Sequence, residues 1–120
     1  MDQKKSNKTS WGGVAVWYDD YLGAEDTYQT QVILPNVLRV LAAKKGEKIL
    51  DVACGQGFFA REIAKSGATV VGADIAPELI KEAQKYPSGV TYHVAPASHL
   101  SFAKDGEFDA AVCVLALQNI

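Results

Sequence analysis

Residues 48–74 read KILDVACGQGFFAREIAKSGATVVGAD, and this stretch decides the fold. It opens with a short, mostly apolar run at 48–53, which predicts a strand. After two glycines, the pattern of residues 58–67 predicts a helix, and a second apolar run at 69–74 predicts another strand. Strands that alternate with helices of about ten residues are typical of βαβ units and a parallel sheet.

The same alternation continues downstream of this stretch. We expect a helix over 77–86, a strand over 90–95, a loop over 96–107 and the most apolar strand over 108–117. Near-continuous apolar runs are typical of strands that are covered on both faces. The sequence therefore predicts an α/β protein with a doubly wound parallel sheet.

The segment upstream of the first strand predicts a helix over 27–44. Pro35 removes a backbone donor and should kink or restart this helix, and Gly46 should close it in the left-handed conformation. Residues 11–25 predict a short helical or irregular segment, and residues 1–10 a flexible polar tail. A chain of 120 residues has room for one core, so residues 11–120 are expected to form one domain.

Composition and charge exclude several classes of function. Twelve basic and fourteen acidic residues leave a net charge of −2, so no basic field supports binding of nucleic acid. No apolar run approaches the roughly 20 residues of a membrane span, and no signal-peptide pattern is present. The two cysteines, Cys54 and Cys113, do not make a disulfide framework, and we expect a cytoplasmic location.

Two glycines and an acidic residue form the pattern that carries chemistry. Gly55 and Gly57 lie between a predicted strand and a predicted helix, where the backbone can approach a ligand and the helix offers free N–H groups. Asp74 ends the next strand, at the distance where an acid accepts hydrogen bonds from ribose hydroxyls. The pattern indicates an adenosine-containing ligand. Its structural alternative is a tight turn with Asp74 as a helix cap.

Asp51 bears on which nucleotide is bound. Gly55-x-Gly57-x-x-Ala60 also fits the dinucleotide fingerprint, which permits alanine at its last position. However, a carboxylate at the end of the first strand would repel a pyrophosphate and attract a cationic ligand at short range. An NAD(P)-binding oxidoreductase half therefore stays open as an alternative.

The motifs resemble those of class I S-adenosylmethionine-dependent methyltransferases. ILDVACGQGFFAREIA (49–64) resembles their first motif, VVGADIAPELIKEAQK (70–85) their second, and FDAAVCVLALQNI (108–120) their fourth-strand motif. APASHLSF (95–102) resembles the segment after their third strand. The resemblance implies a Rossmann-like sheet in the order 3-2-1-4, S-adenosylmethionine as cofactor, and a small-molecule methyl acceptor.

The resemblance also implies roles for individual residues. Asp51 would hold the amine of the cofactor, the backbone around Ala53, Gly55 and Gly57 would pack against its methionine and ribose parts, and Asp74 would take the ribose hydroxyls. The remaining expected contacts are with the adenine or the methionine end: Ile75, Ala97, Ser98 and Leu115, with Tyr21 or Tyr18 as a candidate lid for which core packing is the alternative.

Three departures from the family pattern stand out. Ala53 replaces a common glycine, which we expect to matter little because alanine is small. Pro96 replaces a common aspartate, so a contact with the adenine amino group is missing or moves to Ser98. The chain ends after the fourth of seven expected strands, as an N-terminal, cofactor-binding part.

Neither catalysis nor metal binding is assigned to any residue. His93 and His99 are expected to be structural, and no Cys/His cluster has the spacing of metal ligands. Strand 108–117 should be an exposed apolar edge, which favours a homodimer or a non-catalytic fragment that self-associates.

Overall fold

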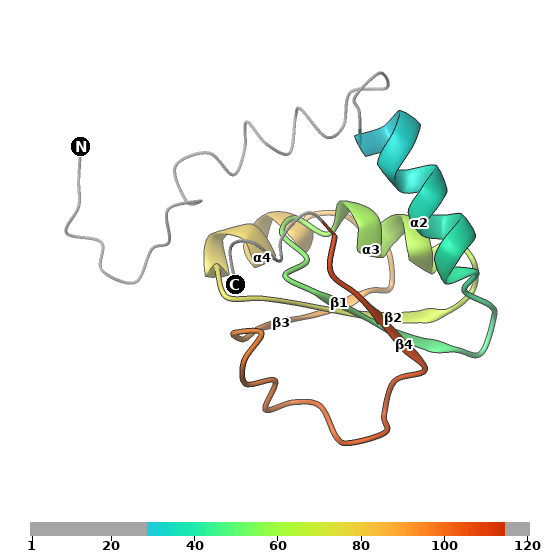
Figure 1. Ribbon diagram of the computed structural model, residues 1–120. Coiled ribbons are helices and arrows are strands. Elements are labelled where there is room, and N and C mark those ends of the chain that lie inside the picture. The colour runs from blue at the N-terminus through green and yellow to red at the C-terminus, as the bar shows by residue number, and fades with distance from the viewer. Residues whose placement is uncertain (1–28, 115–120) are drawn as a thin grey trace.

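Four parallel strands form one sheet in the computed structural model of the chain, which describes residues 29–114 (Figure 1). Their order is β3-β2-β1-β4, as predicted. The strands are β1 (Lys48–Val52), β2 (Thr69–Asp74), β3 (Thr91–Val94) and β4 (Ala110–Val112). The expectations for residues 1–10 and 11–25 lie outside the described residues.

Two helices cover one face of the sheet, α3 (Phe58–Ala64) and α4 (Pro77–Ala83). They lie on the same side because the crossovers from β1 to β2 and from β2 to β3 move in one direction, and such crossovers are right-handed. The main core lies beneath α3, where Ile49 and Val70 of the sheet pack with Ala60 and Ile63 of the helix. Burial of each large aliphatic side chain contributes about 1.5–3 kcal/mol.

Both helices end about three residues before their predicted ends at Gly67 and Tyr86. The last turn of each tightens into i→i+3 hydrogen bonds; for example, Ser66 N–H donates to the Ile63 carbonyl at 3.0 Å and Tyr86 N–H to the Ala83 carbonyl at 3.3 Å. Such tight turns are common at helix ends.

The predicted helix 27–44 is divided at the proline, as expected. Its described part begins with one turn of π-helix, η2 (Gln29–Ile33), and restarts as α2 (Leu34–Leu41) with Pro35 in the first turn. The predicted end was wrong, because Ala42 takes the left-handed conformation (φ 48°) and donates its N–H to the Leu38 carbonyl. Gly46 (φ 92°) instead belongs to the turn that leads into β1.

The connection from β3 to β4 (residues 95–109) contains no helix or strand and lies on the opposite side of the sheet from α3 and α4 (Figure 1). His93 of β3 stacks on Phe102 of this connection, with ring centroids 4.0 Å apart. The imidazole is thus engaged in a packing contact within the opposite layer.

Strand β4 is shorter than the prediction of 108–117. It begins at Ala110, because the Lys48 N–H that a longer ladder with β1 would need is taken by the Asp109 carboxylate at 2.8 Å. It ends at Val112, while residues 115–117 lie outside the described part of the chain. Lys48 also forms an ion pair with Glu107, which ties the end of the connection to β1.

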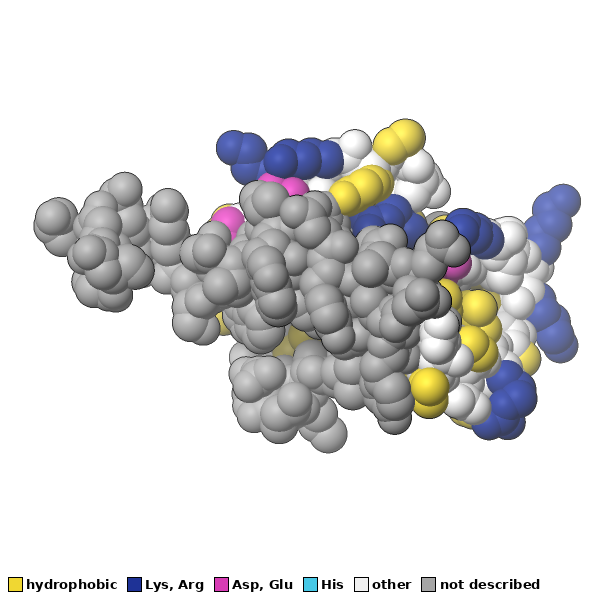
Figure 2. All heavy atoms as spheres, turned by 90° about the horizontal axis from the view of Figure 1, so that it is seen from above, with side chains coloured by type: hydrophobic (Ala, Val, Ile, Leu, Met, Phe, Trp, Pro, Cys, Tyr) yellow, Lys and Arg dark blue, Asp and Glu magenta, His cyan; other side chains and the backbone are white. Residues whose placement is uncertain are grey.

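The surface on the helix side carries Lys and Arg side chains around the periphery, with hydrophobic side chains between them (Figure 2). The exposed large hydrophobic residues of the described chain include Val32, Leu38 and Val40 in the N-terminal helical segment. Between residues 29 and 114, no helix is long and apolar enough to span a bilayer.

Candidate cofactor site

The turn between β1 and α3 is built from three residues in the left-handed conformation. They are Ala53 (φ 58°), Gly55 (φ 58°) and Gly57 (φ 83°). Cys54 N–H first donates to the Ala73 carbonyl at 2.9 Å, and Gly57 N–H then donates to the Cys54 carbonyl at 3.0 Å. Ala53 holds this conformation at a cost of about 1–2 kcal/mol, because left-handed backbone is unfavourable for a non-glycine residue.

The two glycines of this turn face different surroundings. A Cβ atom added at Gly55 would meet no heavy atom within 4 Å, so the turn is open on that side. A Cβ atom added at Gly57 would lie 2.2 Å from the Tyr92 hydroxyl oxygen, which no real contact allows. Gly55 therefore leaves space toward the outside of the turn, whereas Gly57 makes room for a side chain of the protein itself.

Asp74 lies at the carboxyl end of β2 and contacts this turn directly. Its Oδ2 accepts a hydrogen bond from Gly55 N–H, and its Oδ1 accepts one from Ala76 N–H, both at 2.9 Å. The register of β1 and β2 places Val52 beside Ala73, so the residues that follow the two strands meet at one edge of the sheet. The predicted pair of Gly55 and Asp74, 19 residues apart, is thereby brought together.

Asp51 is buried one residue before the end of β1, with 2% of its surface exposed. Its Oδ2 is inaccessible to solvent and has no hydrogen-bond partner among the described residues. The pKa of Asp51 is raised to about 7, chiefly by burial and in smaller part by the nearby Asp74 carboxylate. A cation beside such a carboxylate would stabilise its ionised form, because the opposite charge offsets the penalties of burial and of the neighbouring Asp74 charge.

Ile75, Ala97 and Ser98 follow the ends of the neighbouring strands β2 and β3. Ile75 is 61% exposed, although its chain neighbours Asp74 and Ala76 are buried. Ala95 N–H donates to the Asp74 backbone carbonyl at 2.9 Å, and His99 N–H closes a turn onto the Pro96 carbonyl around Ala97 and Ser98. Tyr21 and Leu115, like Tyr18, lie outside the described residues.

Cys54 lies in the turn but is not prepared for nucleophilic chemistry. Burial raises the pKa of its thiol, and the carboxylates of Asp51 and Asp74 raise it further. The neutral thiol is a poor nucleophile. In the part of the chain that the structure describes, no group of three His, Cys, Asp or Glu side chains could hold a metal ion.

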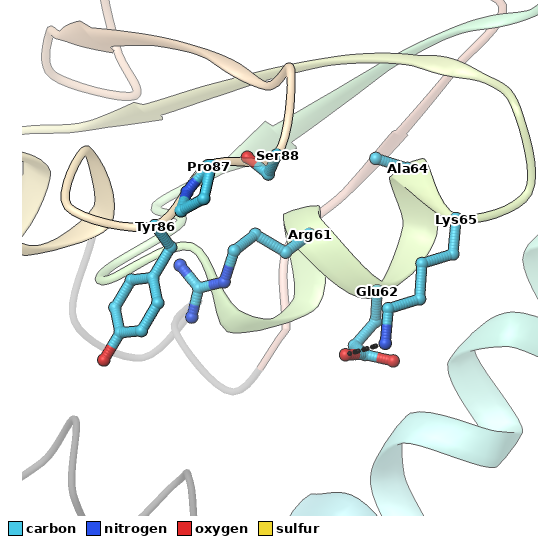
Figure 3. Close-up of a pocket in the computed structure, with 7 residues that line it drawn as sticks. All are labelled: Arg61, Glu62, Ala64, Lys65, Tyr86, Pro87 and Ser88. Carbon is cyan, nitrogen blue, oxygen red and sulfur yellow. Dashed lines mark hydrogen bonds and ion pairs between the residues drawn. The ribbon is translucent and has the colours of Figure 1, made fainter.

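A shallow cavity of about 380 Å³ lies between α3 and the segment that follows α4 (Figure 3). The charged groups that line it are engaged within the protein. Arg61 stacks on the Tyr86 ring at 4.1 Å and donates to the Gln56 carbonyl, and Lys65 pairs with Glu62 at 2.9 Å. The cavity shares no residue with the predicted cofactor site.

Residues 49–120, more than half of the chain, match the family model described as "Methyltransferase domain". The chain belongs to the methyltransferase domain family. This match confirms the resemblance to class I S-adenosylmethionine-dependent methyltransferases that the sequence motifs indicated.

Individual relatives of this methyltransferase domain agree with the family assignment. The ubiquinone biosynthesis O-methyltransferase of Thiobacillus denitrificans is 32% identical over 108 residues, which are 87% of this chain and 47% of the relative. That of Xanthomonas axonopodis is 38% identical over 79 residues, which are 62% of this chain and 33% of the relative. The chain thus spans about half or less of the length of these curated relatives.

A solved structure confirms the fold of the methyltransferase domain. The TehB-like SAM-dependent methyltransferase of Corynebacterium glutamicum aligns with a TM-score of 0.63 and 27% identity, over 84% of this chain and 54% of its own.

Gly72 and Tyr92 lie at this site of the methyltransferase domain and were not predicted from the sequence. Both lie within predicted strands, where glycine signals a close approach and tyrosine usually signals packing. Gly72 inside strand 69–74 could have indicated a close approach of another group. That this group is Tyr92 depends on the strand register, which cannot be obtained from the sequence.

Proposed function

We propose that this chain binds S-adenosylmethionine and forms the cofactor-binding part of a methyltransferase. The observation that carries this proposal is the buried Asp51 carboxylate, whose Oδ2 has no hydrogen-bond partner among the described residues, at the base of an open glycine turn. S-adenosylmethionine has a sulfonium and an amine, so it offers a cation to this carboxylate. Membership of the methyltransferase domain family supports the assignment.

The proposed contacts follow the edge of the sheet. Asp51 holds the amine, the backbone of Ala53, Gly55 and Gly57 passes beside the methionine and ribose parts, and Asp74 accepts the ribose hydroxyls. Ile75 covers one face of the adenine, which would remove its exposed side chain from water. The other proposed contacts are with Ala97 and Ser98 at the adenine edge and with Leu115 and Tyr21 at the methionine end.

The methyl acceptor is proposed to be a small molecule. The curated relatives named as ubiquinone biosynthesis O-methyltransferases support this class. Methyl transfer is an in-line displacement in which the protein supplies mainly proximity and orientation. Because the chain spans 47% or less of these relatives, the cofactor-binding step is the part of the reaction that this chain can be tested for directly.

A titration of the chain with S-adenosylhomocysteine, followed by heteronuclear NMR, tests the proposed function. We expect saturable shifts of the Gly55, Gly57 and Asp74 amides, and none with NAD, whose pyrophosphate would lie beside Asp51. Shifts caused by NAD alone would favour the oxidoreductase alternative. A well-dispersed spectrum that neither ligand changes would contradict nucleotide binding and favour the self-associating fragment.

We also propose that the chain self-associates through β4. This strand is the last of the sheet among residues 29–114, and an edge strand presents N–H and C=O groups that pair with other chains. We expect sedimentation velocity to show a dimer, and Ala111→Lys on β4 to shift it toward monomer. Thr91→Lys on the opposite edge is the matched control. A wild-type monomer across a wide concentration range would refute the interface.

A cytoplasmic location is proposed from the chemistry of the thiols. Cys54 and Cys113 are both free in the structure. A reducing compartment preserves free thiols, which fits this location.

A further inference from the structure

Tyr92 lies in the same row of the sheet as Asp51. The strand register pairs Tyr92 of β3 with Gly72 of β2, and Gly72 with Asp51 of β1. Side chains in one row across parallel strands project from the same face. Because the central residue of this row is glycine, the space between Tyr92 and Asp51 is left for neighbouring side chains.

The ring of Tyr92 occupies that space and ends beneath the glycine turn. A Cβ atom added at Gly72 would lie 3.0 Å from Cδ1 of Tyr92 and 2.9 Å from the Cys54 sulfur, so the ring and the thiol fill the room above Gly72. At the far end of the ring, the hydroxyl oxygen would lie 2.2 Å from a Cβ atom at Gly57. Tyr92 therefore extends from β3 across β2 to the turn that follows β1.

The Arg61 side chain contacts the backbone of the same turn. The guanidinium donates to the Gln56 carbonyl and stacks on Tyr86, toward which it extends from α3 (Figure 3). Burial raises the pKa of the Tyr92 hydroxyl, and the positive charge of Arg61 partly opposes this rise. The two side chains thus contact successive residues of the turn: Arg61 forms a hydrogen bond with Gln56, and Tyr92 packs against Gly57.

We propose that Tyr92 is a positioning residue for the cofactor, because its ring supports the turn at Gly57 and thereby sets the place of Gly55. This inference rests on the proposed function. Gly55 is the open residue of the turn, and its N–H is bonded to Asp74, so a displacement of Gly57 also displaces the carboxylate proposed to bind ribose. In this view, Gly57 and Gly72 are glycines because Tyr92 needs their space.

Substitution of the ring separates positioning from simple stability. We expect Tyr92→Leu to weaken binding of S-adenosylhomocysteine by roughly tenfold or more, because a loosened support misplaces the residues that it carries. Tyr92→Phe keeps the ring and should weaken binding by about threefold or less. The control is Val71→Ala, a buried residue next to Gly72 on the other face, which should destabilise the chain but leave affinity within about twofold.

The cofactor-free protein supplies a second readout, the amide shifts of Gly55 and Gly57. Tyr92→Leu should move both, and Val71→Ala should leave them in place. If Tyr92→Leu bound the ligand like wild type with these shifts unchanged, the positioning role would be overturned.

A double-mutant cycle keeps the inference separate from the proposed function. Gly57→Ala should destabilise the wild-type chain strongly through the clash with Tyr92, and much less in the Tyr92→Leu background, where that clash is gone. Absence of coupling would refute the support of Gly57 by Tyr92.

If wild-type protein did not bind S-adenosylhomocysteine, the proposed function would fail, and the positioning role for that cofactor would fail with it. The coupling and the amide shifts would still decide whether Tyr92 supports the turn.

Discussion

Replacing Asp51 with asparagine should make the chain more stable at pH 8 and at the same time remove most of its affinity for S-adenosylhomocysteine. The folded-state pKa of Asp51 is about 7, whereas an aspartate in an unfolded chain has a pKa of about 3.9. Between these values the folded chain holds a proton that the unfolded chain releases. The Asp51 contribution to the free energy of unfolding therefore falls as pH rises from about 4 to 7 and is constant above.

The size of this effect makes it measurable by urea denaturation. The full loss is on the order of 4 kcal/mol, and Asp51→Asn should recover most of it at pH 8 but little at pH 4. Asp105→Asn is the matched control, because it removes a carboxyl group of the same type from an exposed turn. An Asp51→Asn stability curve parallel to that of wild type would show that Asp51 titrates normally.

Asp51→Asn should lower the affinity for S-adenosylhomocysteine, although it raises the free energy of unfolding. In the proposed complex ionised Asp51 holds the ligand amine, so affinity in the wild type should fall as pH is lowered below about 7. Asp51→Asn should bind about a hundredfold more weakly at pH 8, the order expected when a buried charge pair loses one partner, and should lose this pH dependence. Calorimetric titration at pH 6 and pH 8 measures both. Undiminished affinity of Asp51→Asn would exclude an ion pair with the amine.

Alanine at Gly57 and alanine at Gly55 should have different consequences. Gly57→Ala combines left-handed backbone with a clash against Tyr92, so we expect the free energy of unfolding to fall by about 3 kcal/mol. Gly55→Ala has the same backbone cost but meets no neighbour, so it should lose only about 1 kcal/mol.

Ligand binding by the Gly55→Ala variant completes the comparison. Its methyl group enters the open side of the turn, where we place the cofactor, and should weaken binding of S-adenosylhomocysteine more than the loss of stability explains. Each variant is the control of the other, since they share residue type, turn and φ sign. Equal stability losses, or unimpaired binding by Gly55→Ala, would contradict these assignments.

The meeting of Gly55 with Asp74 could be predicted because it follows from local patterns and from the geometry of parallel strands, whereas the strand order was implied by the resemblance to class I methyltransferases. Alternating strands and helices indicate parallel βαβ units, and parallel pairing brings the carboxyl ends of neighbouring strands to the same edge of the sheet. The proline that restarts the N-terminal helix was predictable for a similar reason, since its effect on the backbone is local.

Features that depend on contacts between distant segments could not be predicted in the same way. The start of β4 at Ala110 depends on a side chain, Asp109, that takes a backbone N–H of β1. The end of α2 at Leu41 depends on an alanine that adopts a conformation usually left to glycine. Gly57 has a left-handed φ, and it also leaves room for Tyr92 of β3, which lies 35 residues later in the chain.

The two hydrogen bonds from backbone N–H groups to the Asp74 carboxylate affect the entropy of ligand binding. With one N–H on each carboxylate oxygen, the side chain loses its rotational freedom when the chain folds. Each oxygen keeps a further lone pair, so a pair of ligand hydroxyls can be accepted without releasing Gly55 or Ala76. Association with a ribose would then carry no entropic penalty for ordering this acceptor. The carboxylate is held in one orientation before any ligand arrives, as the proposed contact with the ribose diol would require.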